Sequence, residues 1–409
     1  MASVSQGLRR LMGRAHRPPA PPERKMSRTG PVIALHSQGR PVWTPRNYAD
    51  LTREGFSQNA VGYRCVRMIA EAAASVSWLL YEGEREHASH PFLALLAEPN
   101  PAQGGAMLME TFYGHLQVSG NAYLEAVAIG GAVRELHVLR PDRMKVVPGG
   151  NGWPEAYEYG ANGQTVRFRQ DGAGGPVPPI LHARLFNPGN DHYGLSPFEA
   201  AARSTDIHNA AGVWNKALLD NAARPSGALV YTGPDGDHNL SEEQFSRLKH
   251  ELESAYQGAA NAGRPLVLEG GLDWKSMGFS PKDMDFIEAK HVAAREIALA
   301  FGVPPMLLGI PGDNTFANYA EANRTFWRQT VLPLVARTAQ ALTNWLAPAY
   351  GGDLRLWYDA DRVDALSGER EALWDRVERS SFLTVNEKRA AVGYEPVEGG
   401  DRLSPASSG

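Results

Sequence analysis

The chain has 409 residues, of which 43% are hydrophobic and 21% are charged. This balance predicts two or three domains with a sizeable buried core and excludes a chain that is disordered throughout, and because no 18-residue apolar run occurs we expect no membrane span. A net charge of −4 at pH 7 argues against a protein whose whole surface grips nucleic acid.

The first 26 residues are Arg-rich and acid-poor, a composition also found in transit peptides. Their PPAPP run and low apolar content favour a flexible tail. Residues 57–80 then predict a helix followed by a strand. Cys65 falls on the apolar stripe of that helix, so we expect a core residue rather than a nucleophile, and as the one cysteine it fits an intracellular setting.

A second helix is predicted over residues 106–118. Alternating apolar and polar residues, separated by Gly-rich turns, follow as far as residue 169 and are typical of antiparallel strands. The fold class that this predicts is α+β, rich in antiparallel sheet.

Two similarly capped helices follow. Ser196 and Ser280 each precede a Pro and an acidic residue, which is a strong helix start. The predicted helices span residues 197–222 and 281–302, and the second ends at Gly302 before two prolines. They bracket an insert over about residues 225–279, which reads as a β-α-β-β module with a final hairpin of strands 265–269 and 272–277.

The segment 303–318 is rich in Gly and Pro and cannot form a regular helix. A long helix is predicted from Tyr319 to Leu346 with a kink at Pro333, and a strand follows over residues 354–359. Short helices complete the chain, one over 367–380 and one that begins at Thr384 and ends at Gly393.

Residue patterns that carry chemistry are absent. The sequence has no phosphate-binding GxxxxGK[ST] loop, no HExxH, no CxxC and no GxSxG. His87 and His90 have no third ligand nearby, and Asp313 with Asn314 is typical of a turn. We therefore expect no enzyme, no cofactor and no metal site.

Several segments, taken in order, resemble the portal proteins of tailed phages of the siphovirus type, the head–tail connectors. The resemblance spans about residues 55–405 and includes GNAYLE (120–125), ELHVLRPDRM (135–144), ILHARLFNPGNDHYGLSP (180–197), NAARPSGAL (221–229), residues 280–309 and TVNEKRAAVGYEPVEGGDRL (384–403). The compact length is also similar to portals of the gene transfer agents of alphaproteobacteria.

The resemblance implies a portal fold whose subunits assemble, in the bacterial cytoplasm, into a ring of twelve at one capsid vertex. The ring would contact the major capsid protein, receive double-stranded DNA from the terminase large subunit, and later hold a head–tail adaptor protein. The finished particle would be a virion or a gene transfer agent particle. No membrane is involved.

The resemblance also implies a division of the chain: a tail (1–26), a wing (27–196), a stem helix (197–224), a clip (225–279), a second stem helix (280–302), a tunnel loop (303–318), the rest of the wing (319–360), a crown (361–396) and a C-terminal tail (397–409).

Candidate residues for the DNA channel are Lys282, Asp285, Glu288 and Arg295 on the second stem helix, with Asp313 and Asn314 in the tunnel loop. Mixed signs suit a lining that does not hold DNA, whereas a strongly basic one would bind it tightly. The alternative is an ordinary solvated helix face. In the clip, Glu242, Glu243 and Lys249 are candidate contacts for an adaptor or motor, with ordinary surface charge as the alternative.

Two other functions stay open on the sequence. One is a minor capsid or scaffold protein without a tunnel. The other is a hydrolase or nuclease, which would need a convergent set of Asp, Glu, His or Ser residues that the sequence does not display.

Overall fold

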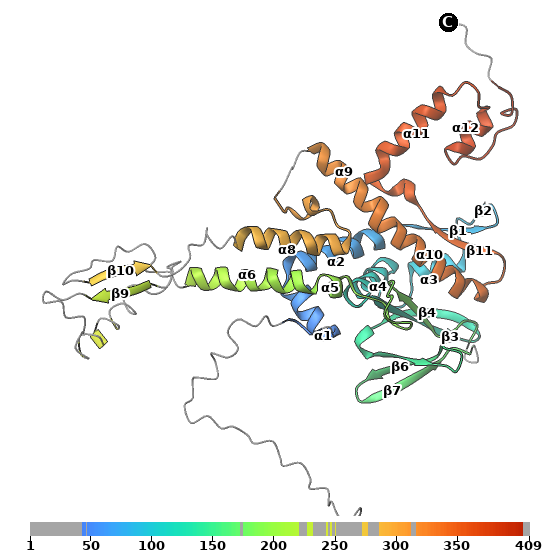
Figure 1. Ribbon diagram of the computed structural model, residues 1–409. Coiled ribbons are helices and arrows are strands. Elements are labelled where there is room, and N and C mark those ends of the chain that lie inside the picture. Colours follow the sequence, from blue (N-terminus) through green and yellow to red (C-terminus); the bar gives the residue numbers. More distant parts are fainter. Residues whose placement is uncertain are drawn as a thin grey trace, which may run out of the picture. The chain divides into compact units, whose positions relative to one another are not determined.

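The chain divides into a unit of residues 1–42 and a unit of residues 43–409, and the second is described here from a computed structural model (Figure 1). The structure describes residues 43–45, 47–171, 175–220, 227–231, 243, 246–247, 250, 272–276, 286–311 and 316–403.

Helices dominate the first part of this unit. They are α1 (Tyr48–Leu51), the π-helical segment η2 (Thr52–Ser57), α2 (Ala60–Ala74), α3 (Pro91–Ala97) and α4 (Gly105–Ser119). The helix predicted in the first part of residues 57–80 is confirmed as α2 and the one predicted over 106–118 as α4, whereas α3 was not predicted. Its start is encoded by His90, whose ring Nδ1 accepts a hydrogen bond from the Phe92 N–H at 3.1 Å.

Three small antiparallel sheets follow the expected α+β pattern. Strand β1 (Trp78–Glu82) lies between β2 (Arg85–Glu86) and β11 (Leu354–Tyr358), so the first sheet joins the two ends of the unit. The second sheet orders β4 (Ala132–Leu139), β3 (Asn121–Ile129) and β8 (Ile180–Arg184). The third orders β5 (Met144–Pro148), β6 (Pro154–Ala161) and β7 (Gln164–Arg169), after the 3-10 turn η3 (Pro141–Arg143).

The helix predicted over residues 197–222 is present but interrupted. It consists of α5 (Pro197–Ala200) and α6 (Ala202–Asp220), with a break at Ala201, whose φ and ψ of −90° and 9° leave the helical region. The other predicted helix is α8 (Phe286–Phe301). Between α6 and α8, strand β9 (Gly227–Tyr231) pairs with β10 (Leu272–Ser276), and residues 243, 246, 247 and 250 are helical. The strand predicted over 265–269 lies outside the described residues.

The C-terminal third differs from the prediction in two respects. After the 3-10 turn η5 (Pro305–Leu308), the long helix is α9 (Phe316–Phe326), a π-helical segment η6 (Trp327–Val331) and α10 (Leu332–Leu346). It therefore begins earlier than Tyr319, and the irregularity lies ahead of Pro333, because a proline lacks the N–H that would close the preceding α turn. The remaining elements are η7 (Ala347–Ala349), η8 (Ala360–Arg362), η9 (Asp364–Leu366), α11 (Ser367–Arg379) and α12 (Val385–Ala391).

One large hydrophobic core joins α2, α4, α8, α10 and the first two sheets. Cys65, Phe112 and Leu356 are among its fully buried members, so the prediction for Cys65 is confirmed. On α6, by contrast, the apolar side chains of Ile207 and Trp214, seven positions apart, are exposed in the isolated chain. A stripe at helical spacing identifies an apolar face but not the molecule that covers it.

Candidate functional site

The helices α6 and α8 lie side by side and run in opposite directions (Figure 1). Three contacts establish this. Phe198 packs on Phe301, Ser204 bonds Glu296, and Lys216 lines the same hollow as Lys290, so residue numbers rise on one side as they fall on the other. A chain that leaves along α6 and returns along α8 presents the segment between them away from the core of the unit.

Phe198 fixes the base of this helix pair. Its ring meets that of Phe301 edge to face, with the centroids 4.8 Å apart. On its other side lie two glycines: a Cβ at Gly55 would be 2.6 Å from the Phe198 ring, and a Cβ at Gly62 would be equally close. The ring therefore needs both glycines, and it locks the start of α2 against the start of α5.

The predicted helix cap at Ser196 is confirmed, and the same side chain also bonds the end of α4. Its Oγ accepts a hydrogen bond from the Phe198 N–H at 3.1 Å, while Glu199 completes the capping box. The same hydroxyl lies 2.8 Å from the carbonyl oxygen of Val118 at the end of α4. Ser196 is fully buried, so the start of the helix pair is fixed to the core.

The end of α8 is fixed as firmly. Gly302 terminates it with φ +67°, the left-handed conformation that favours glycine, as the sequence predicts. The Thr330 hydroxyl in η6 donates to the Gly302 carbonyl at 2.6 Å. Arg295 on α8 donates to the carbonyl of Pro311, which holds the Gly/Pro segment against the helix.

Two of the predicted channel residues can be placed. Glu288 and Arg295 are seven positions apart on α8, share one face of that helix and are exposed. Val292 and Leu299 lie on the same face and are exposed too, which was not predicted. The other predicted channel residues, Lys282, Asp285, Asp313 and Asn314, lie outside the described residues, as does the cap Ser280.

Of the predicted insert contacts, Glu243 is helical and exposed. Glu242 and Lys249 lie outside the described residues.

Two polar contacts of the helix pair were not predicted. Asp206 on α6 accepts hydrogen bonds from both the N–H and the hydroxyl of Thr44, the first at 2.9 Å. Glu296 on α8 accepts a hydrogen bond from the Ser204 hydroxyl on α6. Neither could be found from the sequence, because the partners are 162 and 92 positions apart.

The titratable groups of the core are buried in their neutral forms. Burial raises the pKa of Cys65 to about 12, which makes its thiol a poor nucleophile. Burial lowers the pKa of His115 to about 4 and that of His182 to about 3. The part of the chain that the structure describes contains no group of three His, Cys, Asp or Glu side chains placed to hold a metal ion.

No helix among the described residues has both the length and the apolar character needed to cross a membrane.

The sequence is similar to a known family of proteins and to several of its members. Residues 60–393 match the family described as phage portal protein. A protein of Rickettsia bellii is 40% identical over 86% of this chain and 90% of its own length. The portal protein of Enterobacteria phage HK97 is 25% identical over 92% of this chain and 86% of its own length.

The fold is also similar to chains in solved structures. A chain in the neck of an empty GTA particle is 55% identical, covers 91% of this chain and all of its own, and superposes with a TM-score of 0.72. A chain in the neck of a native GTA particle, computed with C12 symmetry, is 54% identical over 91% of this chain and all of its own, with a TM-score of 0.70.

Proposed function

The chain belongs to the phage portal protein family, and from that premise we propose that twelve copies form the channel through which double-stranded DNA enters and leaves a particle. It is a structural protein of the neck that joins head to tail, of the kind found in gene transfer agents. In this proposal the α6–α8 pair of each copy forms part of the channel wall in the assembled ring.

One observation carries the proposal most directly. The family match spans residues 60–393, from the start of α2 past the end of α12, and this range includes the antiparallel α6–α8 pair with its insert. A paired helix fixed at its base by Phe198, Ser196 and Gly302 is a rigid strut. Twelve such struts around an axis would make a wall, and rigid walls suit a passage for a stiff duplex.

We assign the parts of the chain accordingly: a wing (27–196 and 319–360), stem helices (197–224 and 280–302), a clip (225–279), a tunnel loop (303–318) and a crown (361–396), with tails at 1–26 and 397–409. Within this scheme Arg295 would brace the tunnel loop through Pro311, and the tie between Thr330 and Gly302 would anchor the loop to the wing.

The channel would guide DNA without holding it. Glu288 and Arg295 carry opposite charges, and together with Lys282 and Asp285 they would give a lining of mixed sign. Few counterions would be released by such a surface, so the affinity for the phosphate backbone stays low at physiological salt. Asp313 and Asn314 in the tunnel loop would lie closest to the duplex.

The clip would face outward to the terminase large subunit during packaging and to a head–tail adaptor afterwards, with Glu242, Glu243 and Lys249 as contacts. The wing would face the major capsid protein. Energy for DNA movement comes from the terminase, so we propose that the chain itself is not an enzyme.

Native mass spectrometry and negative-stain imaging of the purified chain test the proposal. We expect assemblies of about twelve copies with a central hole and no ATP hydrolysis. Assemblies without a hole would favour a scaffold or minor capsid protein. A monomer that hydrolyses esters or cuts DNA would favour an enzyme and overturn the proposal.

A further inference from the structure

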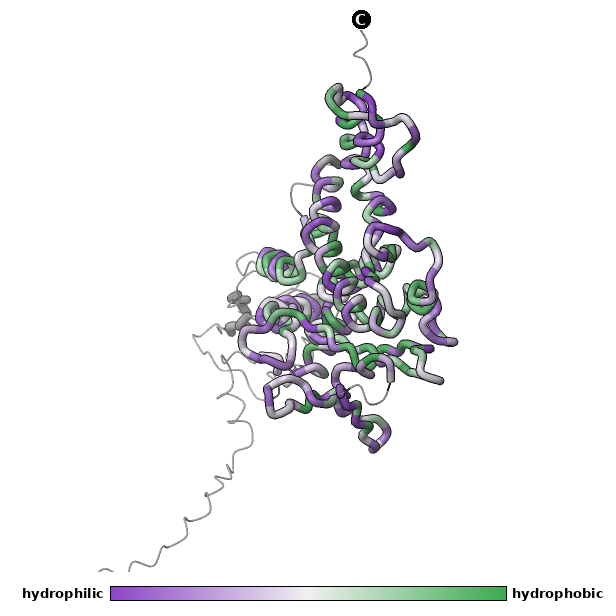
Figure 2. The backbone as a smooth tube through the Cα atoms, turned by 90° about the vertical axis from the view of Figure 1, so that its right-hand side faces the viewer, coloured by the Kyte–Doolittle hydropathy of each residue, from purple (hydrophilic) through white to green (hydrophobic). Residues whose placement is uncertain are grey.

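The proposed crown exposes apolar side chains that a small free-standing segment would normally hide. Trp374, Tyr394 and Phe382 have exposed fractions of 46%, 51% and 75%, whereas Val363 and Val377 are the large apolar side chains buried there. Figure 2 shows hydrophobic residues scattered through this mainly hydrophilic segment next to the end marked C. Such exposure indicates a surface that another molecule covers.

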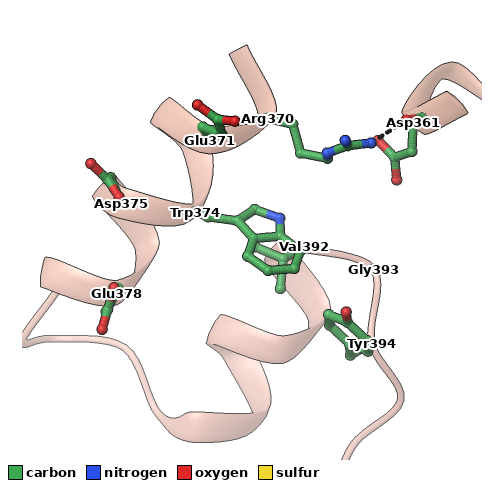
Figure 3. Close-up of a pocket in the computed structure, with 9 residues that line it drawn as sticks. All are labelled: Asp361, Arg370, Glu371, Trp374, Asp375, Glu378, Val392, Gly393 and Tyr394. Atoms are coloured by element: carbon green, nitrogen blue, oxygen red, sulfur yellow. Dashed lines mark hydrogen bonds between the residues drawn. The ribbon is translucent and has the colours of Figure 1, made fainter. Parts of the chain in front are cut away.

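Part of this surface is a hollow of about 680 Å³ between α11 and the turn that follows α12 (Figure 3). Trp374 and Tyr394 form its apolar part, with ring centroids 6.0 Å apart. Carboxylates from Asp361, Glu371, Asp375 and Glu378 surround it, and Arg370 is the cation of the lining.

Three of these carboxylates have no ion pair. Asp375 pairs with Arg379 at 3.2 Å, but Asp361, Glu371 and Glu378 have no ion pair within the described residues. Glu371, Asp375 and Glu378 are spaced four and three apart, so they form a row on one face of α11, and like charges at that spacing repel. A cation from outside would relieve this repulsion.

The opposite face of α11 offers such a cation. Arg376 is about 140° around the helix from Glu371, and it lines a second hollow of about 450 Å³ with Ala372 and Leu373. Its guanidinium has no ion pair among the described residues. One helix thus carries an acidic, aromatic face and, behind it, a face with a cation and apolar neighbours.

We propose that the crown hollow of one copy receives Arg376 of the adjacent copy, with the guanidinium beside Glu371 and over the ring of Trp374. The inference rests on the ring of the proposed function. A cyclic ring needs a heterologous contact, in which two different faces of the same chain meet, and complementary faces on opposite sides of α11 meet that need. Arginine is suited to both partners, since it pairs with carboxylates and stacks on indole.

Cross-linking through introduced cysteines tests the contact. The native Cys65 is buried, so its thiol should not react with the cross-linker. In the full-length chain, Glu371→Cys and Arg376→Cys are combined, and assembled rings are treated with a short bismaleimide. We expect a ladder of covalent multimers on denaturing gels from the double variant and monomers from each single variant. A link within one chain would add no band to the ladder.

Charge exchange provides the second measurement. Glu371→Arg and Arg376→Glu should each raise the subunit concentration at which rings half-dissociate by about tenfold, and the two together should restore it to within about threefold. Gly368→Ala, on the same helix, is the matched control and should leave that concentration unchanged.

The outcomes separate the two proposals. If rings form but the double variant gives no ladder and charge exchange gives no rescue, something else fills the hollow and this inference is wrong while the ring stands. If the unmodified chain forms no ring, the proposed function fails, and the inference fails with it.

Discussion

The hydroxyl of Ser204, near the start of α6, lies 2.5 Å from a carboxylate oxygen of Glu296 on α8. Ser204 is 8% exposed, so its bond to a charged acceptor is partly shielded from water. This bond constrains the rotation of one helix relative to the other, because it joins a side chain of α6 to a side chain of α8.

Removal of this bond should loosen the pair. We expect Ser204→Ala and Glu296→Gln each to lower the free energy of unfolding by about 1 kcal/mol, and the double variant to lose less than the sum. Urea unfolding of the monomeric chain measures all three. Glu288→Gln, on the exposed face of the same helix, is the control, and additive losses in the double variant would show that the two side chains are not coupled.

Gly62→Ala should destabilise the base of the pair. The new Cβ would lie 2.6 Å from Phe198 Cε1 and against the Gly55 carbonyl, so α2 must move, at a cost of about 1–3 kcal/mol. Thermal unfolding gives the measurement. Gly114→Ala in α4 is matched to it, because its Cβ would meet no atom within 4 Å, and it should raise stability by about 0.5–1 kcal/mol. Equal effects from both variants would contradict the role given to Phe198.

Asp206→Ala should release the chain at Thr44. Both hydrogen bonds from Thr44 end on this carboxylate, so the Thr44 amide loses its acceptor when the side chain is cut back. Hydrogen–deuterium exchange of peptides that cover residues 43–47 should accelerate about tenfold while exchange in α4 stays unchanged. Arg203→Ala, which removes an exposed charge from the same helix, should not alter exchange at Thr44.

Acid should weaken the fold through two histidines. The folded pKa values of His115 and His182, about 4 and about 3, lie below the ordinary value near 6.5, so the unfolded chain binds these protons more readily. Their contribution is complete above pH 6.5 and is lost as the pH falls toward 4, at up to about 1.4 kcal/mol per pH unit for each.

His182→Gln should therefore flatten the dependence of the unfolding free energy on pH between 6.5 and 4, even if the variant is less stable throughout. The ring of His182 stacks on Tyr123 with centroids 4.3 Å apart and bonds Asn121 at 3.0 Å, so some loss at neutral pH is expected. An unchanged slope in His182→Gln would mean that other groups govern acid unfolding.

The sequence predicted what depends on neighbours in the chain. The capping boxes of Ser196 with Glu199 and of Thr384 with Glu387 were readable, because each is completed within three residues and the physics is local. The stop at Gly302 was readable for the same reason. The antiparallel α+β class also followed from alternation within single strands.

What the sequence could not predict depends on distant partners. The wedge of Phe198 between Gly55 and Gly62 joins positions more than 130 apart, and nothing local marks those glycines as contacts. Ile207 and Trp214 are apolar and seven apart, yet both are exposed, and a protein that assembles can place such residues at a contact between copies. The hydrogen bond from Ser204 to Glu296 likewise joins positions 92 apart.

The π-helical segment η6 has an evolutionary consequence. One π turn takes up one residue more than the α turn it replaces, so this stretch is the signature of a single-residue insertion absorbed without a loop. Deletion of one residue between Trp327 and Val331 should restore a continuous α-helix in which α9 is turned by about 100° against α10. Homologues that differ by one residue at this point would then share a core around Val335 and Leu342 while aiming the first half of the helix in another direction.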